Sequence, residues 1–236
     1  MSPALRPPNQ LLQALAAAEF EALRPPLKSF EMVRDAVLVE AGTALTHVYL
    51  PHSGAISIAV RLSEGKPVEV AMIGCDSAVG VAEALGDGVS LTDAVVLFPG
   101  TASIIEIADF RTAVAQSTAF RSLLGRHVLA LFAQAQQSGA CNASHSVEAR
   151  MARWLLRACD LWDGETLPMT QELLARMLGV QRNAISIVAH GLQEIGVISY
   201  SRGQIEILNR EALQATACEC HLAVKAKLAQ LLTPRS

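Results

Sequence analysis

Residues 168–208 constrain the fold more tightly than any other part of the chain, because they combine two helix patterns with a turn and a hairpin. Thr170 is a good N-cap residue for the first helix. Leu174 and Leu178 follow at the spacing of one buried helical face. Gly179 then supplies the positive φ of a tight exit. A short helix that ends in a sharp turn is therefore predicted here.

A second helix pattern begins after Gln181, with apolar residues on one side at Ile185, Val188, Ala189 and Leu192. The opposite side is mostly polar and consists of Arg182, Asn183, Ser186, Ile187, His190, Gln193 and Glu194. Beyond it, two short runs of alternating residues flank Arg202-Gly203, which is the signature of a tight hairpin. The second helix should pack on the first by one face and present a polar face to solvent.

This arrangement resembles the winged helix-turn-helix of the Crp/Fnr superfamily, the bacterial regulators related to the cyclic-AMP receptor protein. In that family the second helix enters the DNA major groove and the hairpin, or wing, touches the backbone. The resemblance implies base contacts from Arg182, Asn183 and Ser186. An Arg side chain can bond guanine, an Asn side chain can bond adenine, and a Ser hydroxyl can bond either of these bases. It also implies backbone contacts from Thr170, Gln181 and Arg202.

Two positions depart from the family's common pattern. Many members carry Glu where Asn183 stands and a second Arg where Ile187 stands. We therefore expect a DNA site that differs from the one preferred by the best-known members. Ile187 could instead contact a thymine methyl group.

Upstream, short strand-like runs punctuated by glycines fill the chain from Met32 to Ile107, which predicts a β-sandwich or barrel. The strongest local match to the family is HVYLPHSGAISI, a strand, a turn and a strand. The order of roll, long helix and winged helix-turn-helix resembles the cyclic-nucleotide-binding architecture of the same superfamily. The predicted fold is α+β, with an N-terminal helix and β-roll in 1–116, a dimerisation helix and hinge in 117–145, and the DNA-binding domain in 146–236.

The roll lacks the groups that hold a cyclic nucleotide in this family. Ala78 replaces the expected Glu, and no Arg precedes Ala94. No Lys or Arg lies between Lys66 and Arg111, whereas seven Asp and Glu residues do. A buried phosphate needs a cation or several aimed donors. We therefore expect neither cyclic AMP nor cyclic GMP as effector, which leaves another ligand or constitutive DNA binding.

The segment after the roll is helical in pattern and carries a heptad-like series at Phe120, Leu124, His127, Leu131, Gln134, Ser138 and Cys141. The family dimerises through this helix, so the resemblance implies a dimer seam at Phe120, Leu124, His127 and Leu131. A single long helix that only covers the roll is the alternative. Residues 142–146 are predicted to break this helix and to form the hinge between the domains.

The most metal-like cluster in the sequence is Cys218-Glu219-Cys220-His221. On a helix, adjacent side chains and those two apart point in different directions. Cys220 also falls on an apolar stripe with Val224 and Leu228, so packing is the expected role. We therefore expect that the protein binds no metal and no cofactor. The alternative that stays open is a metal-binding or thiol redox role for Cys218, Cys220 and His221.

The sequence gives little support to the other metal-based sensor types of the family. The chain has no cysteine before Cys75, which excludes the N-terminal iron–sulfur cluster of some members. Haem needs axial ligands, and His47, His52 and His127 show no spacing that selects a pair. A haem or thiol redox sensor is therefore a minor alternative.

Charge and composition agree with a DNA-binding protein whose basic character is local. Residues 1–145 carry nine Lys and Arg against thirteen Asp and Glu, and the rest of the chain carries ten against nine. No apolar run approaches the ~18 residues of a membrane span, so no membrane partner is expected. Five dispersed cysteines favour a reducing cytoplasm over a disulfide scaffold.

The expected partners are double-stranded DNA, a second copy of the chain and RNA polymerase. An enzyme is not expected, because the sequence contains no G-x-S-x-G elbow, P-loop, H-E-x-x-H or Rossmann fingerprint. The alternative from another class is a protein-interaction module that kept the winged fold without DNA binding.

Overall fold

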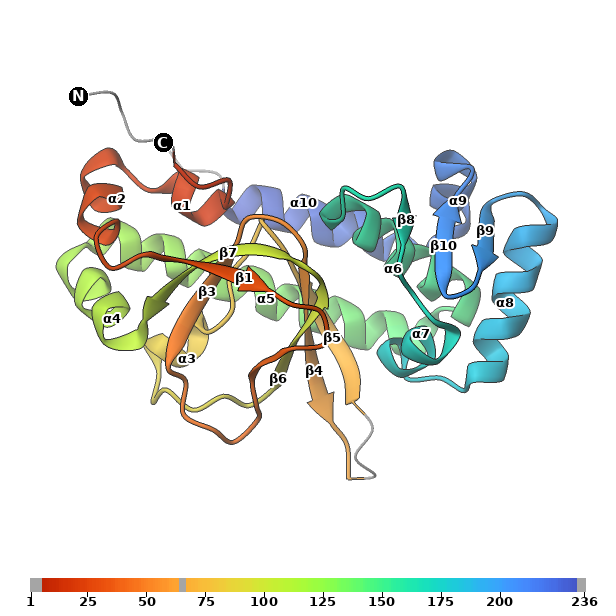
Figure 1. Cartoon of the computed structure of the whole chain (residues 1–236), viewed down its shortest axis with the longest axis horizontal. Helices are drawn as coiled ribbons and strands as arrows, with labels where there is room; N and C mark the ends of the chain where they lie inside the picture. Colours follow the sequence, from red (N-terminus) through yellow and green to blue (C-terminus); the bar gives the residue numbers. More distant parts are fainter. Residues whose placement is uncertain (1–5, 64–66, 233–236) are drawn as a thin grey trace.

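A computed structural model of the chain describes residues 6–63 and 67–232 (Figure 1). The N-terminal half, called the roll below, contains strands β1 (Lys28–Met32), β2 (Val37–Val39), β3 (His47–Pro51), β4 (Ala55–Arg61), β5 (Pro67–Ile73), β6 (Asp93–Phe98) and β7 (Gly100–Glu106). Its helices are α1 (Gln10–Ala14), α2 (Ala17–Leu23), α3 (Val81–Leu85) and α4 (Ile107–Gln116).

The long helix α5 (Thr118–Ser144) leads from the roll into the C-terminal half. There the helices are α6 (Val147–Leu161), α7 (Gln171–Leu178), α8 (Arg182–Glu194), α9 (Arg210–Thr216) and α10 (Cys220–Leu232). The strands are β8 (Thr166–Leu167), β9 (Ile198–Ser201) and β10 (Gln204–Ile207). The unit from α6 to α9 is called the reader below.

Two antiparallel sheets, ordered β1-β7-β3 and β2-β6-β4-β5, form the roll that the strand-like runs predict. Apolar side chains from both sheets, such as Val48 and Ile56, are fully buried between them. Strand β1 lies outside the predicted runs, because its apolar alternation is limited to Phe30 and Met32 and its other side chains are exposed. It is held by its pairing with β7.

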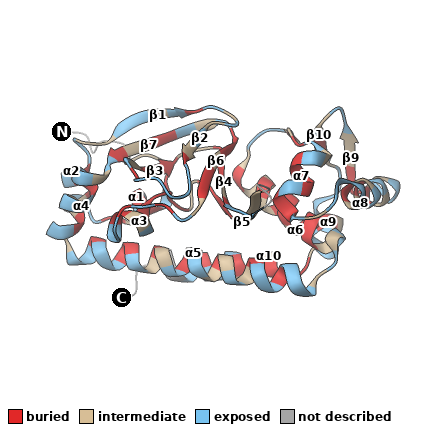
Figure 2. Ribbon diagram, turned by 90° about the horizontal axis from the view of Figure 1, so that it is seen from below, coloured by how far each residue is buried: buried red, intermediate tan, exposed pale blue. Residues whose placement is uncertain are grey.

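Helix α5 runs along the roll, and α10 returns beside it from the reader toward α1 (Figures 1 and 2). Ser117 caps the start of α5 by accepting from the Phe120 N–H at 3.0 Å. The break predicted for residues 142–146 is confined to His145 and Ser146, because α5 continues to Ser144 and α6 starts at Val147. This break is the joint between the two halves.

The two halves share one continuous apolar core at the joint. Met72 and Phe98 of the roll are buried together with Leu155 of α6. Across the same contact, the Arg157 guanidinium bonds the Asp76 carboxylate at 2.7 Å, and Trp154 Nε1 donates to Glu69 at 2.7 Å. The position of the reader relative to the roll is therefore fixed by both apolar and charged contacts in this conformation.

None of the helices in residues 6–63 and 67–232 combines the length and apolarity needed to cross a lipid bilayer.

Candidate nucleic-acid interface

The helix pair of the reader forms as its sequence predicts. The Thr170 hydroxyl caps α7 by accepting from the Leu173 N–H at 3.1 Å. Gly179 ends α7 in the left-handed region, with φ of 62°, and α8 begins three residues later. The buried Arg150 guanidinium donates to the Leu178 carbonyl, which would otherwise be left unpaired at the end of α7.

The start of α8 presents a polar surface supported by a rigid core. Ile185, Ala189 and Leu192 are fully buried against the rest of the reader. Arg182 and Asn183 are exposed in the first turn, and Ile187 beside them is 73% exposed. Apolar anchoring on one side leaves these side chains free to meet another molecule.

Ser186 differs from the other two predicted base-contacting residues. It is half-buried, and its hydroxyl donates to the Gln171 Oε1 at 2.5 Å. The Gln171 N–H in turn donates to the Tyr200 hydroxyl at 3.2 Å. This chain of hydrogen bonds joins α7, α8 and β9. Gln171 was not among the predicted site residues, because nothing in its spacing marks it as a contact to Ser186.

The predicted hairpin forms the wing, with β9 and β10 joined at Arg202 and Gly203. Both residues have positive φ, 49° and 77°, which is the geometry of a two-residue turn of the primed type. The Tyr200 N–H donates to the Gln193 side chain at 2.6 Å, so the wing is tied to α8. Strand β8 adds a third strand that the sequence did not suggest.

The residues predicted to meet the DNA backbone lie at the surface. Thr170, Gln181 and Arg202 are all exposed, at the starts of α7 and α8 and at the tip of the wing. Arg176 is also exposed on α7. Two of these four side chains, Arg176 and Arg202, carry positive charge.

The structure covers most of the predicted dimer seam on α5 within one chain. Phe120, Leu124 and His127 are 5%, 1% and 0% exposed, because they pack into the roll of their own chain. Leu131 is partly buried against the same core. A side chain that is already covered within one chain has no surface to offer a second copy. This face of α5 instead covers the roll, which was the alternative interpretation.

His127 has a specific role in that contact. Its Nε2 accepts the Ala78 N–H at 3.2 Å and lies 2.8 Å from the Ser77 hydroxyl. Burial lowers the pKa of His127 to about 4, so the ring is neutral near pH 7. The ring fixes α5 against the loop that precedes α3.

In the stretch between Lys66 and Arg111, which contains no Lys or Arg, Asp93 forms an ion pair with a cation from outside that stretch. Asp93 is buried and pairs with the Arg61 guanidinium at 2.8 Å. Burial alone would raise the pKa of Asp93, but the Ala41 N–H and Arg61 together lower it. Arg61 comes from β4, outside the stretch between Lys66 and Arg111 that contains no Lys or Arg. Its charge is already offset by Asp93.

Two domain models match the chain. Residues 30–117 match the cyclic nucleotide-binding domain, and residues 149–216 match the Crp-like helix-turn-helix domain. The chain belongs to the Crp/Fnr family of transcriptional regulators. This regulator thus combines the family's roll, long helix and DNA-binding helix-turn-helix.

Solved structures agree with this regulator's fold. A putative Crp/Fnr-family regulator from Eubacterium rectale has a TM-score of 0.70 at 18% identity, covering 87% of this chain and 96% of its own. FixK2 from Bradyrhizobium japonicum has a TM-score of 0.68 at 17% identity, with coverage of 81% and 98%. The c-di-GMP responsive regulator CLP from Xanthomonas campestris has a TM-score of 0.67 at 15% identity, with coverage of 82% and 100%. A search of curated proteins gave no match.

Proposed function

We propose that this regulator binds a near-palindromic DNA site as a homodimer, with Arg182 and Asn183 of each α8 contacting base edges in the major groove. The observation that carries the proposal is the exposed polar first turn of α8 above a fully buried apolar stripe. Two such helices about 34 Å apart would contact successive major grooves on one side of the duplex.

Ser186 contributes to the same face in a different way. The Ser186 hydroxyl donates its hydrogen bond to Gln171, which holds α8 against α7. In the proposed complex the hydroxyl oxygen therefore accepts a hydrogen bond from a base. Thr170, Gln181 and Arg202 contact phosphates on either side of the groove.

The second copy is proposed to dock on the outer face of α5. This face carries a heptad series of exposed residues, which are Ser122, Gly125, Leu129, Phe132, Gln136 and Gly139, all small or apolar except Gln136. Leu129 and Phe132 are 57% and 60% exposed, which is unusual for large apolar side chains in the middle of a helix. Two glycines in the series would let two such helices approach closely.

The effector is proposed to be neither cyclic AMP nor cyclic GMP. Arg61 is paired with Asp93, and the loop before α3 is bonded to His127, so no cation in these contacts remains for a phosphate. We place the regulator in the cytoplasm, where its DNA and its partner RNA polymerase are found. Calorimetric titration with both cyclic nucleotides should show no binding heat, and a stoichiometric transition would overturn this part.

Fluorescence anisotropy against a pool of palindromic duplexes at two salt concentrations tests the central proposal. We expect affinity that falls steeply with salt and selection of a preferred site. On that site Arg182→Ala should weaken binding by about 1–3 kcal/mol. Arg24→Ala is the matched control, because Arg24 lies at the end of α2 and its side chain is 48% exposed.

An Arg182→Ala protein that folds normally and binds the selected site with native affinity would contradict the assignment of Arg182. Absence of any salt-dependent DNA affinity would instead favour a protein-interaction module built on the winged fold.

A further inference from the structure

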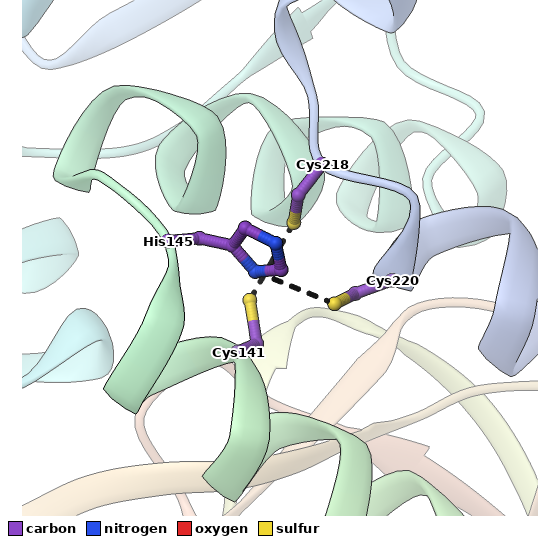
Figure 3. A group of neighbouring side chains, drawn as sticks. All are labelled: Cys141, His145, Cys218 and Cys220. Atoms are coloured by element: carbon purple, nitrogen blue, oxygen red, sulfur yellow. Dashed lines mark hydrogen bonds between the residues drawn. The ribbon is translucent and has the colours of Figure 1, made fainter.

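Four side chains of metal-ligand type converge where α5 ends and α10 begins (Figure 3). Cys141 lies in the last turn of α5, and His145 caps that helix. Cys218 lies in the connection after α9, and Cys220 is the first residue of α10. Their three Sγ atoms and one ring nitrogen all lie within 4.8 Å of one another.

The local structure explains how these side chains meet. Cys141 and His145 are four residues apart, so both project from the same side of the end of α5. The helix pattern is interrupted between Thr216 and Cys220, which frees Cys218 from the direction that a continuous helix would impose. Cys218 and Cys220 can therefore face the same point. His221, the sequence neighbour, faces away and contacts Asp160 at 3.5 Å.

The separations suit a single ion. Zinc–sulfur bonds of about 2.3 Å and zinc–nitrogen bonds of about 2.0 Å give tetrahedral edges of roughly 3.8 Å between sulfurs and roughly 3.5 Å between sulfur and nitrogen. Here the Cys141 and Cys218 sulfurs are 3.5 Å apart, and Cys220 Sγ lies 3.6 Å from His145 Nδ1. A cluster of several irons needs more space between its ligands than this group offers.

Surrounding groups support the same assignment. The His145 Nε2 lies 3.3 Å from the Glu219 carboxylate, which leaves Nδ1 directed at the sulfurs in the manner of a histidine metal ligand. The Gln137 amide donates to Cys220 Sγ at 3.1 Å. Arg150 is buried, its Nε has no hydrogen-bond partner among the described residues, and it lies near the side chains of Cys141 and Cys218. Three thiolates and one divalent ion carry a net charge of minus one, which would balance this arginine.

We propose that Cys141, His145, Cys218 and Cys220 bind one zinc ion in a closed tetrahedral site. The three cysteines are buried and all four positions are supplied by the protein, which is the pattern of structural zinc and leaves no position for substrate. Because His145 lies between α5 and α6, the ion joins α10 to the joint between roll and reader.

The metal content of the full-length chain, purified under reducing conditions, tests the proposal. Native mass spectrometry and elemental analysis should find one zinc per chain. After removal of zinc by a chelator, added Co²⁺ should give the visible bands of a tetrahedral ion and a thiolate-to-cobalt charge-transfer band. The chelator should also lower the Tm of the native chain, because binding free energy adds to folding free energy.

Variants locate the site. Cys218→Ser and His145→Ala should each weaken Co²⁺ binding by at least about a hundredfold, more than the loss of an outer-shell partner costs. Cys159→Ser and His221→Ala are matched controls and should bind Co²⁺ as the native chain does. Circular dichroism identifies any variant that does not fold.

Failure of the reduced native chain to take up one Co²⁺ would overturn the proposal, whether or not the variants fold. A Cys141–Cys218 disulfide whose reduction restores no metal binding would have the same meaning. Native affinity in both Cys218→Ser and His145→Ala would show that the ion is held elsewhere.

Discussion

Helix α8 is covered on one side, whereas α5 is covered on two. In α8, Ile185, Ala189 and Leu192 pack into the reader, and the opposite side, with Arg182, Asn183 and Ile187, is exposed. In α5, Leu124 packs into the roll while Ala130 packs against α10. A third face of α5, with Leu129 and Phe132, is left uncovered.

This difference decides what a helix's pattern can reveal. A helix with one neighbour needs one apolar stripe, so its polar face is available for binding and can be assigned directly. A helix with several neighbours is apolar around most of its circumference. More than one heptad series can then be drawn along it, and the series alone does not say which neighbour each contacts.

The largest effect is expected on the roll-facing side of α5. Leu124→Ala should lower the free energy of unfolding by about 2–5 kcal/mol, because the fully buried side chain leaves a cavity. Denaturant unfolding measures this change, and Leu91→Ala, at an 86% exposed position of the roll, is the control, with an expected change within about 0.5 kcal/mol. Similar losses in the two variants would contradict the packing of Leu124 into the roll.

The outer face of α5 should govern self-association instead. Replacing both Leu129 and Phe132 by Glu should weaken the proposed dimer at least a hundredfold, or about 3 kcal/mol, because charge would be buried between the helices. Analytical ultracentrifugation gives the dissociation constant. Leu91→Glu, at an 86% exposed position of the roll, should leave it unchanged. A doubly substituted chain that still dimerises would show that the seam lies elsewhere.

Two buried titratable groups, one on α5 and one facing the reader, should have opposite effects on stability. Burial raises the pKa of Glu69 to about 7, so its contribution is present below its ordinary value near 4.5 and is lost as pH rises through 7. Burial lowers the pKa of His127 to about 4, so its contribution is present above 6.5 and is lost as pH falls toward 4.

Each contribution is at most roughly 3 kcal/mol, and the two offset each other in the native chain. Glu69→Gln should therefore reveal stability that increases from pH 5 to pH 7. Unfolding curves at several pH values test this. A pH profile identical to that of the native chain would mean that the Glu69 carboxyl is not protonated preferentially in the folded state.

The smallest effect is expected at the wing. Arg202→Ala should weaken binding to all duplexes alike, by on the order of 1 kcal/mol, and reduce the salt slope by about one, because a phosphate contact carries no sequence information. Anisotropy titrations at several salt concentrations measure both quantities. If Arg202→Ala changed the preferred site, the wing would be reading bases and would share the role proposed for α8.

The sequence alone determined the reader: the capped start of α7, the left-handed Gly179, the buried stripe of α8 and the turn at Arg202 and Gly203 all lie where their patterns predict. Each depends on contacts between residues close in the chain, so the local pattern carries the information. The strands of the roll are predictable for the same reason, except β1, whose apolar alternation is limited to Phe30 and Met32.

The tertiary structure alone decided which face of α5 is free and which cysteines meet. Leu124 is buried because the roll covers it, and Cys141 meets Cys218 because α10 returns along α5. These contacts join residues far apart in the chain. A heptad pattern predicts that a side chain will be covered, and a pair of cysteines indicates that a ligand can be bound. Which residue covers the side chain, or completes the ligand set, depends on how the distant segments pack.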